Sequence, residues 1–153
     1  KTIKSMRKYW RTKSKEWSVD SIINNEDLSR ASLDIPKLHS KYYNILLAEK
    51  KMLYVLSEKK AILEDQLEGW FLKTMTTEER IEAGLPDFPN KKYLKSDVDR
   101  HIARYPDIVQ LNLKIGIQLD KIDFVKDIIK SIHNRSFVIK DAISWILFTN
   151  GQN

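Results

Sequence analysis

The 153-residue chain has the length of a single domain built around one hydrophobic core. It contains no cysteine, which excludes disulfides, a thiol nucleophile and a thiolate zinc site. The sequence has neither an apolar run long enough to span a bilayer nor a signal-peptide pattern, so we expect no membrane contact and a cytoplasmic location. The net charge of +6 arises at the start, because residues 1–15 carry seven Lys or Arg and no acid.

Residues 1–27 are predicted to form a basic N-terminal arm. Ile3, Met6 and Trp10 recur at helical spacing, but charge density and a terminal position favour fraying, so we expect the arm to be partly helical or disordered. Residues 28–153 are predicted to form a helical domain, interrupted by an irregular, proline-containing loop at about 84–94.

A long helix is predicted over residues 36–73. Pro36 suits a first helical turn, and apolar residues recur at helical spacing after it. Thr76 and Glu79 have the spacing of a capping box for a short helix, which Gly84 is placed to end.

The next predicted helix begins with a second capping-type pair, Ser96 and Asp99, and is broken or restarted by Pro106. Beyond Pro106, spacings of three and four residues form a heptad seam with one polar position. Its members are Ile108, Leu111, Ile115, Gln118, Ile122, Val125, Ile129 and Ile132. The sequence therefore predicts an all-α protein whose long helices form an antiparallel hairpin or bundle.

The same segment carries a second apolar flank that includes Phe124. Two apolar faces on one helix favour self-association, although neighbours in the same chain could cover them instead. Residues 133–136 look like a break before a last helix at 137–149. That helix, with Trp145, is too apolar to remain in water, so we assign Phe124 and Trp145 to oligomerisation together with the seam.

The sequence offers little that could support catalysis. His39, His101 and His133 lie far apart and match no zinc spacing, and the four glycines stand singly, so no phosphate loop is present. We expect a non-enzyme without metal or cofactor.

Single-stranded DNA binding requires cations that follow the backbone and aromatic faces on which bases stack. Two segments offer both. The arm supplies Arg7, Lys8, Trp10 and Arg11, and the long helix supplies Tyr43, Lys50, Lys51, Tyr54, Lys59 and Lys60. The alternatives are a solvated basic tail for the arm, and core aromatics with ordinary surface lysines for the helix.

Several stretches resemble the UvsY recombination mediators of T-even-like phages and cyanophages. One is residues 35–43, Ile-Pro-Lys-Leu-His-Ser-Lys-Tyr-Tyr; the others are residues 94–99, 121–124, 130–137 and 139–145. Together the resemblance spans about residues 28–148. One departure is residues 64–68, Glu-Asp-Gln-Leu-Glu, where related proteins carry basic residues, so the presumed DNA contact shifts towards Lys50, Lys51, Lys59, Lys60 and the arm.

The resemblance implies a homo-oligomeric ring of six or seven subunits without catalytic residues. It implies partners as well: single-stranded DNA, a phage RecA-like recombinase and a phage single-strand DNA-binding protein, all in the host cytoplasm. The protein would load the recombinase onto DNA covered by that binding protein. The competing interpretation is a helical scaffold or adaptor that binds another protein through its coiled-coil-like face and has no DNA role.

Overall fold

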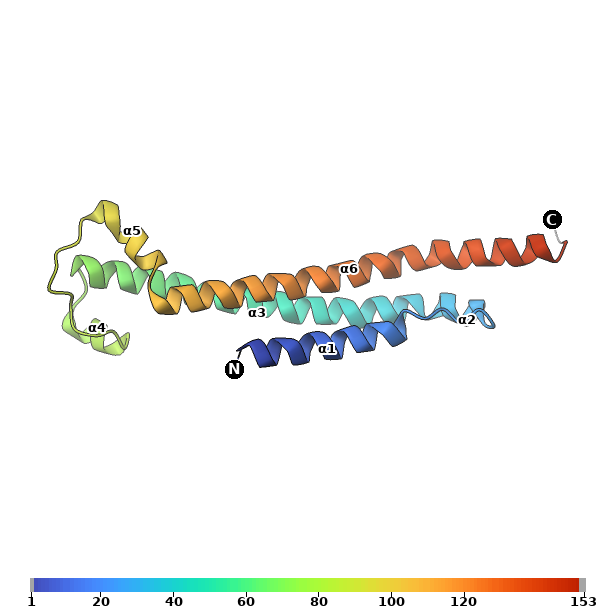
Figure 1. Cartoon of the computed structure of the whole chain (residues 1–153), viewed down its shortest axis with the longest axis horizontal. Helices are drawn as coiled ribbons and strands as arrows, with labels where there is room; N and C mark the ends of the chain where they lie inside the picture. The colour runs from blue at the N-terminus through green and yellow to red at the C-terminus, as the bar shows by residue number, and fades with distance from the viewer. Residues whose placement is uncertain (1, 152–153) are drawn as a thin grey trace. The chain divides into compact units, whose positions relative to one another are not determined.

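The computed structural model describes the backbone of residues 2–151 and the side chains of residues 8–151, and its regular structure there is entirely helical (Figure 1). The predicted all-α class is confirmed. The chain divides into two compact units. Unit 1 contains residues up to Lys50 and from Leu119 onwards, and unit 2 contains residues 51–118. The arm boundary predicted near residue 27 lies inside unit 1.

Unit 1 is built on an antiparallel pair of helices. It contains α1 (Thr2–Asp20), α2 (Leu28–Leu33), the first part of α3 (Ile35–Leu72) and the later part of α6 (Pro106–Thr149). Early α3 lies beside late α6, since the His39 ring contacts that of His133 and Glu49 pairs with Lys121 at 3.9 Å. The buried apolar residues on these two segments are Tyr42, Leu46, Ile122, Val125, Ile128, Ile129 and Ile132.

Most of the N-terminal arm folds as α1, which packs on α3 and α6 within unit 1 (Figure 1). Trp10 meets Phe124 edge-on with ring centroids 4.9 Å apart, and Trp17 meets Tyr42 at 5.5 Å. Of the two states predicted for the arm, the structure has the helical one, because these aromatic rings anchor the helix despite its charge.

A smaller apolar cluster fixes α2 against the end of α6. Leu28 and Ala31 pack on Ile139, and the Asp27 carboxylate caps α2 by accepting the Arg30 backbone N–H at 2.9 Å.

Unit 2 packs the end of α3 against α4 (Thr77–Glu82), α5 (Lys95–Ala103) and the start of α6. Its core consists of Leu67, Trp70, Phe71, Leu85, Val98, Ile102 and Ile108. The predicted capping box is confirmed, since the Glu79 N–H donates to Thr76 Oγ1 at 3.1 Å and the Thr76 N–H donates to Glu79 Oε2 at 2.7 Å. Gly84 follows α4 in the left-handed region at φ 68°.

Two predictions about helix boundaries are wrong. Ser96 and Asp99 do not cap α5; the N-cap is Leu94, which makes no side-chain bond, so Ser96 already lies inside the first turn. The break predicted at residues 133–136 does not exist, because α6 is one uninterrupted helix. The Ser136 hydroxyl is satisfied within the helix by the His133 carbonyl at 3.3 Å, and Arg135 is buried in a tertiary contact.

Most of the heptad seam is covered by its own chain. Ile108, Gln118, Ile122, Val125, Ile129 and Ile132 are buried, with Gln118 only 3% exposed, while Leu111 and Ile115 are half-buried. This matches the alternative interpretation above, and the buried positions offer no open surface to a second subunit. Phe124 is likewise half-buried beneath Trp10, whereas Trp145 is 66% exposed.

Within residues 2–151, none of the helices combines the length and the apolar character needed to cross a lipid bilayer.

Candidate nucleic-acid interface

The positive charge of the chain belongs to unit 1. Residues 51–118 contain equal numbers of acidic and basic residues, so the formal excess of +6 lies entirely outside them. A polyanion is therefore attracted mainly to unit 1.

Helix α1 presents a basic face to solvent. Lys8, Arg11 and Lys15 are all exposed and follow one another at spacings of three and four, so they line one side of the helix. Tyr9, Trp10 and Trp17 point the other way, into the packed side. The Arg7 side chain, which was also predicted to bind DNA, lies outside the described residues.

Trp10, whose ring was predicted to stack on DNA bases, is half-buried on the packed side of α1. Its ring is held against Phe124, and the neighbouring Tyr9 ring lies under the Lys121 ammonium at 4.4 Å. Burial, together with the Glu49 carboxylate, raises the pKa of Tyr9 well above its ordinary value. The aromatic residues of α1 therefore anchor the helix, and its exposed cations are left to contact a ligand.

The basic face of α1 continues into a groove of about 480 Å³. Three basic residues line it, together with two acidic residues and two others: Arg11, Lys15, Lys41, Glu16, Asp20, Thr12 and Val19. Lys41 also forms an ion pair with Asp20, whose carboxylate accepts the Tyr42 hydroxyl at 2.9 Å. Burial alone would raise the pKa of Asp20, but the hydrogen bonds from Lys41 and Tyr42 and the nearby positive charges outweigh it and lower that pKa.

Arg135 fixes the C-terminal end of α1. Its Nη1 donates to the carbonyls of Asp20 at 3.0 Å and Ser21 at 3.1 Å, and its Nη2 donates to that of Ile22 at 2.7 Å. A cation at the last carbonyls of a helix is favoured by the helix dipole. The guanidinium thus holds the end of the basic helix α1 against α6.

The α3 residues predicted to bind DNA divide between the two units. In unit 1, Tyr43 is 46% exposed and stacks on His39, and Lys50 is half-buried.

In unit 2, Lys51, Tyr54 and Lys59 are exposed, whereas Lys60 is half-buried and lies 3.5 Å from the Glu64 carboxylate. That ion pair weakens Lys60 as a phosphate ligand.

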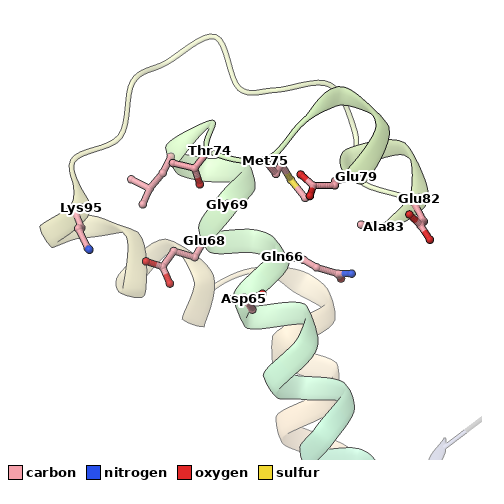
Figure 2. Close-up of a pocket in the computed structure, with 11 residues that line it drawn as sticks. Asp65, Gln66, Glu68, Gly69, Thr74, Met75, Glu79, Glu82, Ala83 and Lys95 are labelled. Carbon is pink, nitrogen blue, oxygen red and sulfur yellow. The ribbon is translucent and has the colours of Figure 1, made fainter.

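Unit 2 also has an acidic groove of about 860 Å³, shown in Figure 2. Carboxylates of Asp65, Glu68, Glu79 and Glu82 line it, and Lys95 is its single basic residue. Asp65 and Glu68 belong to residues 64–68, the segment in which related proteins were expected to carry basic residues. Because carboxylates repel phosphate, the groove does not suit DNA.

The predicted DNA-binding residues did not include Lys15, Lys41 or Arg135. The spacing of Lys8, Arg11 and Lys15 was visible, and Lys41 and Arg135 lie in the stretches that carried the family resemblance. Their partners at residues 20–22 could not be found from sequence.

The three histidines lie far apart in the sequence and match no zinc spacing. His39 and His133 nevertheless lie together with ring centroids 5.1 Å apart, and His101 packs between Phe71 and Tyr93 in unit 2. Across the described residues, no group of three or more potential ligand side chains is arranged to hold a metal ion.

The family model that matches this chain is described as the recombination, repair and single-stranded DNA-binding protein UvsY, and the match covers residues 16–152. The chain belongs to the UvsY family. The resemblance noted from the residue patterns is thereby confirmed, and it now extends over most of the chain.

Similar solved structures include three crystal lattices of the bacteriophage T4 recombination mediator protein UvsY. Lattice type II has a TM-score of 0.74 at 18% identity, covering 92% of this chain and 96% of that one. Lattice type IV has the same TM-score at 16% identity, covering 91% and 97%. At such identities the likeness establishes the shared fold. No curated protein matches this chain.

Proposed function

We propose that this protein binds single-stranded DNA and promotes loading of a phage RecA-like recombinase onto DNA covered by single-strand binding protein, without catalysing a reaction itself. Membership of the UvsY family over residues 16–152 carries the proposal. The T4 protein of the same fold is a recombination mediator. The host cytoplasm is the corresponding place of action.

The primary DNA contact is assigned to the exposed face of α1. Lys8, Arg11 and Lys15 provide three phosphate ligands on a helix that Arg135 and two tryptophans hold in place. A helix that is already docked loses little further entropy when DNA binds. Lys41 adjoins this face through the shared groove.

Residues of α3 supply further contacts in this proposal. Lys51, Tyr54 and Lys59 combine positive charge with an aromatic face, as single-strand binding requires, and Tyr43 with Lys50 offers the same pair in unit 1. The individual contacts are few, so affinity would arise from their repetition in an oligomer.

Self-association is assigned to the last part of α6. Over residues 137–148 large apolar side chains are exposed on this helix, namely Phe137, Val138, Ile143, Trp145, Ile146, Leu147 and Phe148. Large apolar side chains that remain exposed along one helix mark a protein contact. A second copy of the same segment is the proposed occupant, in an assembly of six or seven subunits.

The experiment is a salt titration of affinity for a fluorescent single-stranded oligonucleotide, measured by anisotropy. Replacing Lys8, Arg11 and Lys15 with Gln should weaken binding and reduce the slope of log affinity against log salt by about 2. The matched control replaces Lys126, Lys130 and Lys140 of α6, which are also exposed and in unit 1. An equal slope in the two variants would remove α1 from the interface, and absence of binding by the wild type would favour a scaffold or adaptor.

A further inference from the structure

Two histidines from distant parts of the chain meet on the surface of unit 1. His39 lies in α3 and His133 in α6, and their ring centroids are 5.1 Å apart with the planes tilted by 36°. His133 is exposed and His39 is half-buried, so an ion from solvent can reach both rings. The DNA-binding proposal does not use this pair.

We propose that His39 and His133 form a binding site for a divalent transition-metal ion of the zinc class. Imidazole nitrogens bind such ions at about 2.0–2.1 Å, and two imidazoles on a tetrahedral ion then have centroids about 5 Å apart. The observed separation meets this requirement. In this proposal the His39 and His133 rings each turn one nitrogen towards the shared ion.

The ligand set determines which ions bind. Imidazole suits Zn²⁺, Ni²⁺ and Cu²⁺, whereas Mg²⁺ and Ca²⁺ require oxygen ligands. In the described part of the chain no third potential ligand completes the cluster, so water fills the remaining positions. The ion is therefore exchangeable, and it binds more weakly than in a four-ligand structural site.

A bound ion would link two helices of unit 1. It would join α3 to α6 and stabilise the folded state by mass action. The His39 ring also stacks on Tyr43 at 5.8 Å with the planes only 13° apart, so the ion would add positive charge next to an exposed aromatic ring. The site therefore adjoins one of the proposed base-stacking residues.

The test titrates Zn²⁺ into the full chain, free of any histidine tag, by calorimetry and thermal unfolding, with Mg²⁺ as the hard-ion comparison. The chain has three histidines, which makes the control direct: His39→Gln and His133→Gln remove ligands, and His101→Gln removes the histidine packed in unit 2. Histidine resonances in NMR spectra report which rings are affected.

We expect one Zn²⁺ per chain and a rise in melting temperature of roughly 3–5 °C at saturating metal. His39→Gln and His133→Gln should each weaken binding at least tenfold, while His101→Gln and the Mg²⁺ titration leave the protein unchanged. Undiminished Zn²⁺ binding in the His39→Gln, His133→Gln double variant, or equal loss in His101→Gln, would overturn the proposal. Because none of these titrations contains DNA, their outcome does not depend on whether the protein is a recombination mediator.

Discussion

Arg135 is a charged residue that is buried and holds the end of α1 in place. Its guanidinium reaches three consecutive carbonyls at residues 20–22, more than a hundred positions away in the sequence. Planar geometry with several donors makes arginine suited to this role, and a lysine has only one nitrogen to offer.

Replacing Arg135 with Met should therefore lower the free energy of unfolding by about 3 kcal/mol, since three carbonyls lose a charged donor. Arg135→Lys should recover part of this loss. Urea denaturation followed by tryptophan fluorescence measures both, with the exposed Lys140→Met as control. A wild-type midpoint in Arg135→Met would show that α1 does not depend on this contact.

The Asp20 carboxylate makes the stability of the folded protein depend on pH. Its pKa is lowered in the folded state despite burial, through its bonds to Lys41 and Tyr42. The resulting stabilisation is present above the unfolded value of about 3.9 and is lost as pH falls through the folded pKa. Asp20→Asn should thus be less stable than wild type at pH 7, and the difference should vanish towards pH 2. Denaturation curves across this range measure it, and Asp123→Asn, an exposed carboxylate, should keep the wild-type profile. A constant difference at every pH would contradict the assignment.

At the scale of the helices, local signals in the sequence predicted what local physics determines. The long helix expected at residues 36–73 is α3, the Thr76 and Glu79 capping box forms, and Pro106 starts α6. The failures involve tertiary partners. Residues 133–136 resemble a helix break because they are polar. The polar side chain of Arg135 instead forms the hydrogen bonds that hold the end of α1. The heptad seam indicated a partner helix, yet its spacing could not say whether that helix belonged to the same chain.

The candidate site was predictable only in part. The basic character of α1 was visible, but Trp10 could have faced solvent or core, and only packing on Phe124 decides between them. The proximity of His39 and His133 depends on the antiparallel register of α3 and α6, which the sequence did not reveal.

The continuity of α6 can be tested with a helix breaker. Ser136→Pro should lower the free energy of unfolding by about 3 kcal/mol or more and reduce the helix content, because proline removes a backbone hydrogen bond and clashes with the preceding turn. Ser136→Ala controls for loss of the hydroxyl. Circular dichroism and thermal melts measure the effect, and a tolerated proline would restore the break that the sequence suggested.

For the whole molecule, buried and exposed apolar residues of α6 should respond differently to charge. Trp145→Asp with Phe148→Asp should dissociate the proposed oligomer while the helices remain, because both side chains are exposed. Val125→Asp should unfold unit 1, because that residue is 1% exposed and the charge would lack a partner. Native mass spectrometry with circular dichroism separates the outcomes. A wild-type mass of a single 18.0 kDa chain would contradict self-association.

We propose that the basic helix α1, docked on α3 and α6 within unit 1, makes this protein a recombination mediator. The most direct measurement is the rate at which a RecA-like recombinase assembles on single-stranded DNA already covered by single-strand binding protein, with and without this chain. We expect the wild type to shorten the assembly delay and the Lys8, Arg11 and Lys15→Gln variant to lose most of that effect, while the Lys126, Lys130 and Lys140→Gln control retains it. An assembly rate that the wild-type protein leaves unchanged would contradict the claim.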